Sequence, residues 1–299
     1  MRPSPLVLLL AIFGCTADKY VVLEDNPDPA TPDTNDTSDT SDTGEPVVEP
    51  DPDPYDSWLD TVSIPGATFE MGCTRADEWS CDDSELPIRT ISLAPIEVMR
   101  TEVPRGMYRA ITGGAHRPPG CTQDDCVAVK MSWFDAVAFC NLVSDAEGLT
   151  RAYTISGSTV RWDQSADGWR LPTEAEWEYL ARGGRDLIYS GSADLDRVAW
   201  TQANADGRAH EVAQKMDNDF ELYDMSGNAW EWVWDWQGAY DPTATSNPTG
   251  PTSGDKRILR GGAWDAGADA ARISFRGAMA PDTKVDTNGF RILRGAVAR

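Results

Sequence analysis

The chain has 299 residues, with 49 acidic and 26 basic side chains and a formal net charge of −23 at pH 7. No run of basic residues occurs, so the composition excludes the electrostatic pattern of a nucleic-acid-binding protein. Apolar residues make up 40% of the chain and 12 tryptophans are present, which is enough to bury one large core outside a polar N-terminal segment.

Residues 1–15 have the pattern of a signal peptide. Arg2 precedes an apolar run from Leu6 to Phe13, and Gly14 and Cys15 follow it. The run is too short to span a bilayer, and the residues that end at Cys15 resemble a bacterial lipobox. We therefore expect an exported lipoprotein of the cell envelope, held to the outer membrane or the cell surface by acyl chains on Cys15. The alternatives are ordinary secretion and an uncleaved anchor.

Residues 16–57 are predicted to be a disordered, acidic tether. They are rich in Asp, Thr, Ser and Pro and nearly repeat a short pattern over Thr37–Thr43. Such a segment has too little apolar surface to form a core. We expect a solvated spacer between the membrane and a single folded domain over residues 58–299.

The folded domain begins with predicted strands. Residues 62–72 alternate like a pair of strands joined at a Pro65–Gly66 turn, and residues 90–99 predict another strand. Pro104 suits the first turn of a helix, and Gly113 is a stop signal for it. The apolar positions expected to face the core from this helix are Met107, Tyr108 and Ile111.

The cysteines fit an oxidising compartment. Cys73 and Cys81 are close in sequence, as are Cys121 and Cys126, and each pair is expected to close a local disulfide. Cys140 remains alone among apolar neighbours. An inert buried thiol is favoured there over a relocated catalytic one.

A second helix is predicted to begin at a capping box of Ser132 and Asp135 and to end near Gly148. Its apolar face consists of Trp133, Ala136, Val137 and Cys140. Short strands are expected over residues 160–162 and 169–171, on either side of a turn.

The segment from Arg170 to Gly184 predicts a third helix with both ends defined. Thr173 and Glu176 form a capping box, and the glycine pair at the end is a stop signal. Trp177, Leu180 and Ala181 have helical spacing and are expected to face the core, with Glu178 and Arg182 paired on the outside.

Four segments together resemble the formylglycine-generating enzyme, or sulfatase-modifying factor, family. They are residues 170–184, Leu222–Trp232, Leu259–Trp264 and Asn288–Arg291, and the resemblance extends from about Trp58 to Leu293. It implies an α+β fold in one compact domain, a variant of the C-type lectin fold with short strands, a few helices and much loop. A fold alone does not give a function.

The chain departs from the family's oxidases at their reactive site. Those enzymes carry two cysteines between the Arg-Gly-Gly and Gly-Phe-Arg motifs, which bind copper(I) and engage the substrate cysteine. Residues 262–299 contain no cysteine, and Ala263–Gly267 occupy the beginning of the remodelled loop. We therefore expect no oxidase chemistry and no copper cofactor.

The resemblance also implies structural calcium. The ligands carried over from the family are the side chains of Asp224 and Glu231 and the carbonyls of Gly227 and Ala229. Calcium prefers such carboxylate and carbonyl oxygens. The alternative is a hydrogen-bonded turn buttressed by Trp230 and Trp232.

A second, weaker calcium site is implied at Asn204 and Ala205. The loop that follows differs from the family pattern and offers Asp217 and Asp219 as possible ligands. The same alternative of a hydrogen-bonded turn applies here.

Other enzyme classes have little support. The chain has two histidines, His116 and His210, so a three-histidine zinc site is excluded. No Gly-x-Ser-x-Gly elbow occurs. Arginines in the C-terminal part can either clamp an anion or hold loops together, and the second interpretation is favoured; they are Arg272, Arg276 and Arg291.

These observations favour a ligand-binding or protein-interaction module. The predicted binding surface is the loop after Gly262 with aromatic support from the preceding segment, and its residues are Trp264, Asp265, Asp269, Trp236 and Tyr240. The alternatives are an oxidoreductase of a divergent, metal-dependent branch, either formylglycine-generating-like or sulfoxide-synthase-like, and an accessory structural domain of the envelope.

Overall fold

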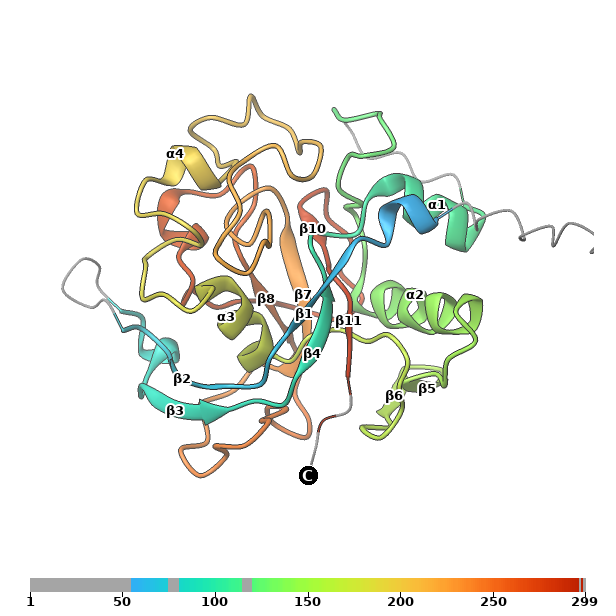
Figure 1. The fold of residues 1–299 in the computed structure, drawn as a ribbon, viewed down its shortest axis with the longest axis horizontal. Helices are drawn as coiled ribbons and strands as arrows, with labels where there is room; N and C mark the ends of the chain where they lie inside the picture. Colours follow the sequence, from blue (N-terminus) through green and yellow to red (C-terminus); the bar gives the residue numbers. More distant parts are fainter. Residues whose placement is uncertain (1–54, 75–80, 115–119, 296, 298–299) are drawn as a thin grey trace, which may run out of the picture. The chain divides into compact units, whose positions relative to one another are not determined.

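A computed structural model of the protein describes residues 55–74, 81–114, 120–295 and 297. The predicted signal peptide, the lipidation site Cys15 and nearly all of the predicted tether lie outside these residues, as does His116. The described part forms an α+β domain of short strands, a few helices and long loops, which confirms the expected fold class (Figure 1).

Within the described ranges, the helices are short and the strands shorter. The α-helices are α1 (Arg105–Thr112), α2 (Trp133–Ala146), α3 (Glu174–Arg182) and α4 (Leu195–Val198), and the 3₁₀ turns are η1 (Asp56–Trp58), η2 (Asp83–Glu85) and η3 (Ala268–Ala271). The strands are β1 (Thr61–Ile64), β2 (Thr68–Met71), β3 (Arg89–Ser92), β4 (Ile96–Met99), β5 (Tyr153–Ser156), β6 (Thr159–Trp162), β7 (Trp230–Trp236), β8 (Arg257–Arg260), β9 (Gly277–Met279), β10 (Asn288–Gly289) and β11 (Leu293–Arg294).

The central sheet has the strand order β10-β7-β8-β9, and a second sheet has the order β1-β4-β11. The pairs β2–β3 and β5–β6 form separate two-stranded ribbons. β7 and β8 are antiparallel and are joined by a long connection, residues 237–256, which forms the orange loops at the bottom of Figure 1. The central sheet therefore has two ends, and different loops gather at each.

The predicted hairpin over residues 62–72 is wrong. Both strands exist, but β1 pairs with β4 and β2 pairs with β3. Pro65 and Pro95 lie at the break between the two ladders, and proline has no N–H for a sheet. The same break divides the strand predicted over residues 90–99 into β3 and β4.

The strand predicted over residues 169–171 is reduced to a single bridge between Arg170 and Leu293. The strand predicted over residues 160–162 is confirmed as part of β6. Its partner β5 was not predicted from the sequence.

The predicted helix starts are confirmed. Ser132 with Asp135 and Thr173 with Glu176 each form both hydrogen bonds of a capping box. Helix α1 follows Pro104 and ends at Gly113, which has a left-handed φ of 64°. The helix boundaries were predictable because the residues that define them are local in sequence.

Helix α3 is buried along its whole length, so the predicted outward pair of Glu178 and Arg182 lies inside. The pair forms at 2.7 Å. Arg260 of β8 donates to the other oxygen of Glu178 at 2.6 Å. Because two guanidinium groups and these hydrogen bonds satisfy the carboxylate, the core accepts a charged helix face.

The core consists of two main apolar clusters. One surrounds α2 and includes Trp133, Trp169 and Trp232, and the other surrounds α3 and includes Trp177. These four tryptophans are fully buried, as the large-core expectation required. Among the described residues, no helix is long and apolar enough to cross a membrane.

Both predicted disulfides form, between Cys73 and Cys81 and between Cys121 and Cys126. Cys140 is the free cysteine of the described part and is fully buried on α2. Burial raises the pKa of its thiol. Since the thiolate is the reactive form, the expected inert role of Cys140 agrees with the structure.

Candidate functional site

The loop of the predicted calcium site runs from Asp224 to the beginning of β7. Asp224, Gly227 and Asn228 all have left-handed φ angles, of 58°, 82° and 59°. At Gly227 a Cβ would lie 2.4 Å from the carbonyl oxygen of Trp200. Only glycine fits this close approach, so the neighbouring backbone determines the shape of the loop.

The two predicted carboxylate ligands are brought together but have protein partners. Glu231 is fully buried and receives hydrogen bonds from Arg291, at 2.7 to 3.0 Å, and from Trp177 Nε1 at 2.8 Å. Asp224 is also buried, and its Oδ2 accepts from the backbone N–H of Ala213 at 2.8 Å. The loop is therefore a hydrogen-bonded turn as it stands.

Glu102 belongs to this site and was not predicted from the sequence. Its carboxylate accepts from Asn228 Nδ2 at 2.6 Å and from the backbone N–H of Ala229 at 2.9 Å. Glu102 lies between β4 and α1, more than 120 residues before these partners, and a lone acidic residue at a strand end gives no signal of such a contact.

The buried carboxylates of Glu102, Asp224 and Glu231 repel one another. Burial, with the charges of Asp224 and Glu231, raises the pKa of Glu102 well above its ordinary value. Burial also raises the pKa of Asp224 to about 6. Arg291 contacts Glu231 directly, and its positive charge partly offsets the rise in the pKa of both Glu102 and Asp224. Full ionisation would leave two negative charges in excess of Arg291.

An oxygen-rich, negatively charged loop has the donor chemistry that calcium requires. In the described ranges, no group of three or more Asp, Glu, His or Cys side chains is arranged to hold a metal ion. An ion here would therefore depend on the carbonyls of Gly227 and Ala229 as well as on Asp224. Glu231 is the least available ligand, because Arg291 and Trp177 already use both of its oxygens.

The atoms predicted for the second calcium site have other partners. Asn204 Oδ1 accepts from the N–H of Thr201 at 2.8 Å, and the carbonyl of Ala205 accepts from His210 Nε2 at 2.9 Å. Asp219 pairs with Arg185 at 3.5 Å. Asp217 and Asp219 line a separate surface hollow together with Arg185.

His210 takes part in a stack of aromatic and charged groups. Its ring lies 3.8 Å from the ring of Trp200, whose ring also has the ammonium of Lys215 at 3.9 Å. Burial lowers the pKa of His210. Its Nε2 is engaged with the Ala205 carbonyl, so the ring is placed for packing and hydrogen bonding.

The loop after β8, where family oxidases carry thiols, is held by polypeptide contacts. The backbone N–H of Trp264 donates to the carbonyl of Asn228, and Trp264 Nε1 donates to the carbonyl of Asp286 at 3.3 Å. Ala263 and Ala271 are fully buried. The interior of this loop thus contains methyl groups and no sulfur.

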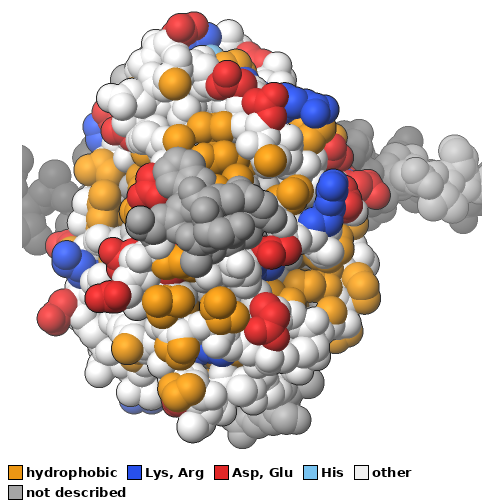
Figure 2. All heavy atoms as spheres, turned by 90° about the vertical axis from the view of Figure 1, so that its left-hand side faces the viewer, with side chains coloured by type: hydrophobic (Ala, Val, Ile, Leu, Met, Phe, Trp, Pro, Cys, Tyr) orange, Lys and Arg blue, Asp and Glu red, His pale blue; other side chains and the backbone are white. Residues whose placement is uncertain are grey.

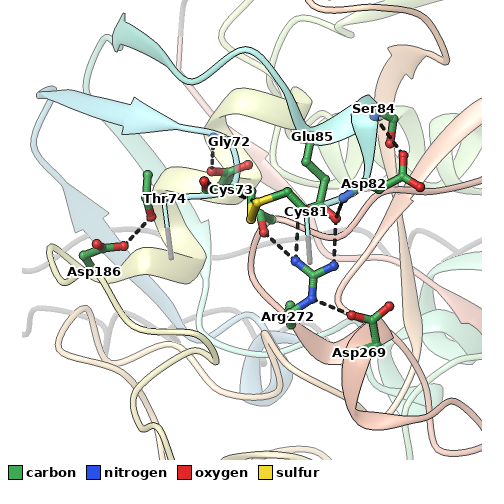
Figure 3. Close-up of a disulfide and its surroundings, with 12 residues drawn as sticks. Gly72, Cys73, Thr74, Cys81, Asp82, Ser84, Glu85, Asp186, Asp269 and Arg272 are labelled. Carbon is green, nitrogen blue, oxygen red and sulfur yellow. Dashed lines mark hydrogen bonds and ion pairs between the residues drawn. A yellow bond between two sulfur atoms is a disulfide. The ribbon is translucent and has the colours of Figure 1, made fainter. Parts of the chain in front are cut away.

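Arg272 fixes the end of the same loop (Figure 3). It donates to both oxygens of Glu85 and to Asp269, at 2.7 to 2.8 Å. Glu85 follows the Cys73–Cys81 disulfide, and its backbone carbonyl accepts from the N–H of Cys73. The disulfide, η2 and η3 therefore form one connected unit.

The favoured interpretation of the three C-terminal arginines is confirmed. Each forms a bidentate ion pair with a buried glutamate, and the pairs are Arg272 with Glu85, Arg276 with Glu174, and Arg291 with Glu231. These guanidinium groups hold loops together and do not form an anion clamp.

The structure does not gather the predicted binding surface on one face. In the β7–β8 ladder Glu231 pairs with Arg260, and Trp236 pairs with Arg257. Trp264, Asp265 and Asp269 follow the Arg260 end, whereas Trp236 and Tyr240 belong to the opposite end. The prediction of one joint binding surface was therefore wrong. Because β7 and β8 are antiparallel, the segment that follows β7 and the segment that follows β8 leave the sheet at opposite ends.

Trp236 and Tyr240 have partners of their own. The Arg257 guanidinium lies 3.7 Å from the ring of Trp133 and 3.5 Å from that of Trp236. The Tyr240 ring lies near two guanidinium groups, at 4.0 Å from Arg89 and 4.2 Å from Arg276. They support their end of the sheet and cannot support Trp264.

Comparison with known proteins now identifies the family, because residues 46–296 match the sulfatase-modifying factor enzyme 1-like domain. The chain belongs to the sulfatase-modifying factor family. The match covers described residues 55–295, including the Asp224–Glu231 loop and the cysteine-free loop after β8.

Several known proteins are similar to this chain over most of their length. A Paenibacillus barcinonensis protein named chaperone protein LppX is 29% identical over 269 residues, covering 78% of this chain and 90% of that protein. The formylglycine-generating enzyme of Thermomonospora curvata is 27% identical over 279 residues, covering 77% and 91%.

Among solved structures, Treponema denticola variable protein 1 has a TM-score of 0.71 and 29% identity, covering 78% of this chain and 94% of that one. PvdO from Pseudomonas aeruginosa, at 24% identity and a TM-score of 0.65, shares the fold. The fold is therefore shared by proteins with different names.

Proposed function

We propose that this member of the sulfatase-modifying factor family is a ligand-binding or protein-interaction module without formylglycine-generating oxidase activity. The observation that carries the proposal is the thiol-free loop of residues 262–272. Copper(I) oxidases of the family need two thiolates there, and this chain has alanine methyls and the Arg272–Glu85 pair. Cys140 is no substitute, because it is buried on α2 in the cluster around Trp133.

The names of similar proteins support a role other than oxidation. Neither the chaperone LppX nor the variable protein of Treponema denticola is named as an oxidase, and both cover most of this chain. The alternative, an oxidoreductase of a divergent branch, rests on the similarity to formylglycine-generating enzymes.

The surface also supports an interaction role. On the face that carries β2, β3 and α3, hydrophobic side chains gather among charged ones (Figure 2). A hollow of about 450 Å³ on this domain is lined by Phe69, Tyr179 and Phe220. Apolar hollows bordered by charge are typical of binding surfaces.

The proposed recognition surface is the loop of Trp264, Asp265 and Asp269. Both aspartates are exposed, and Trp264 is partly exposed beside them. An aromatic side chain with one polar atom already satisfied contributes contact area at little entropic cost. Trp236 and Tyr240 are not part of this surface.

Export and anchoring complete the proposal. Two disulfides are typical of an extracytoplasmic protein. Cys15 is proposed to carry the lipid, with residues 16–57 as a spacer. Calcium in the Asp224–Glu231 loop is proposed as a structural ion that stabilises the start of β7.

The recognition surface is tested by capturing partners from envelope extracts with the full-length protein and with a Trp264→Ala/Asp265→Ala variant. The variant should fold and lose the captured partner. Arg151→Ala, an exposed change elsewhere, is the matched control and should retain it. Equal capture by the double variant would place recognition on another surface.

A further inference from the structure

A cavity of about 530 Å³ lies under the β7–β8 connection, at the end of the central sheet away from Trp264. This volume falls in the range of small-molecule sites, roughly 300–1,000 Å³. The connection supplies one wall, and the beginning of α3, the end of β7 and Arg276 supply the other.

The inner wall of the cavity is rigid. Glu174 and Arg276 form a bidentate ion pair at 2.6 and 2.7 Å, and both side chains are almost fully buried. Arg276 also donates to the carbonyls of Ser84 and Gly238. The ring of Tyr240 is held near Arg276 and Arg89. Glu174 and Arg276 are engaged with each other and with backbone carbonyls, so they shape the cavity.

Asp235 is a buried polar group of this wall with capacity left for a ligand. Its side chain is buried, with 4% of the residue exposed, and it lines the cavity. Oδ2 accepts from the N–H of Glu174 in the first turn of α3 at 2.8 Å. None of the described residues donates a hydrogen bond to Oδ1.

Gly250 packs closely against the Asp235 carboxyl group. A Cβ at this position would lie 2.7 Å from Oδ1, and the backbone has a left-handed φ of 71°. A side chain here would collide with the Asp235 carboxyl. The two residues come from opposite walls of the cavity and pack against each other.

The charges that line the cavity nearly cancel. Arg89 and Arg276 are balanced by Glu174 and Asp241. Burial and the neighbouring Glu174 raise the pKa of Asp235 to about 8, so its carboxyl is mainly neutral at pH 7. The remaining polar lining consists of hydroxyl and amide side chains, which are Ser246, Asn247, Thr249 and Thr252. Neither an anion nor a cation is favoured by this lining.

We infer that this cavity binds an uncharged, polyhydroxylated ligand, one or two saccharide units in size, with a ligand hydroxyl bonded to Asp235 Oδ1. Hydroxyl groups both donate and accept, which suits a carboxyl group and a rim of hydroxyl and amide side chains. The inference rests on the proposed function as a binding module and gives it a ligand class.

The test is saturation-transfer NMR with the full-length protein and a defined set of neutral probes, namely glucose, galactose, mannose, N-acetylglucosamine and their β1,4-linked disaccharides. At least one probe should give a signal with the native protein. Asp235→Asn, which keeps the side-chain shape, and Gly250→Ala should each weaken binding at least tenfold. Asp219→Asn, in the separate hollow beside Arg185, should leave it unchanged.

Two results would overturn the inference. The first is no signal from any probe with native protein whose melting temperature is normal. The second is a signal that Asp235→Asn and Gly250→Ala both leave intact, which would place saccharide binding elsewhere. Either result leaves the proposed function standing if partners are still captured through Trp264, so the two failures can be distinguished.

Discussion

Arg272 donates to both carboxylate oxygens of Glu85, at 2.8 and 2.7 Å, across 187 residues of sequence. The pair joins the loop after β8 to the turn that follows the Cys73–Cys81 disulfide (Figure 3). The loop that Arg272 holds is the one in which oxidases of the family keep reactive thiols. Arg272 therefore anchors the cysteine-free loop to the rest of the domain.

Breaking this pair should be costly. Arg272→Ala leaves the carboxylate of Glu85 buried without its cation, and such a change destabilises a fold by about 3–5 kcal/mol. The measurement is urea unfolding of the native protein and the variant. Arg151→Ala removes a solvent-exposed pair with Asp145 and should leave the free energy of unfolding almost unchanged. Equal losses in the two variants would contradict a structural role for Arg272.

Calcium should stabilise the protein through the Asp224 loop. An ion at 100 times its dissociation constant adds about 2.7 kcal/mol to the free energy of unfolding. We expect a higher melting temperature in calcium than in a chelator for the native protein, and a much smaller difference for Asp224→Asn. If chelation leaves the native melting temperature unchanged, the loop is only a hydrogen-bonded turn.

Without calcium, stability should fall as the pH rises from about 4 to 6. The pKa of Asp224 is about 6 in the fold against an ordinary value of 3.8, so the native state holds a proton that the unfolded chain has already lost in this window. The slope of stability against pH is then negative, and above pH 6 this contribution is constant.

Glu102 shifts in the same direction and should add to the effect. Asp224→Asn should flatten the profile between pH 4 and 6, measured by urea unfolding in chelator. A native profile that rises through this window and is unchanged by Asp224→Asn would contradict the described cluster.

Cys140 should be chemically silent in the folded protein. Its thiol is fully buried and its pKa is raised by burial, so little thiolate forms and no reagent reaches it. Iodoacetamide should label Cys140 only in denaturant, as peptide mass spectrometry would show. Rapid labelling under native conditions would restore the hypothesis of a relocated catalytic thiol.

The features predicted correctly from the sequence are mostly local. The capping boxes at Ser132 and Thr173 involve residues three positions apart, and both disulfides close short loops. The fold followed from four motifs that are characteristic of one family. Each of these signals is complete within a short segment.

The features missed depend on distant partners. Glu102 meets Asn228 across 126 residues, and no pattern around Glu102 announces that contact. Trp236 and Trp264 were grouped because both follow family motifs, but the β7–β8 register separates them. The breaks at Pro65 and Pro95 could likewise be predicted only if the segments around these two prolines were known to be neighbours in the sheet. Each of these features depends on a contact between residues that are far apart in the sequence.

The most direct test of the account is an oxidase assay. Full-length protein is supplied with copper(I), oxygen, a reductant and a cysteine-containing sulfatase peptide, with the Thermomonospora curvata formylglycine-generating enzyme as the positive control. We predict that mass spectrometry finds formylglycine with the control enzyme and none with this protein. Conversion of the peptide cysteine by this protein would contradict the account, because its thiol-free loop would then support the chemistry that we propose it has lost.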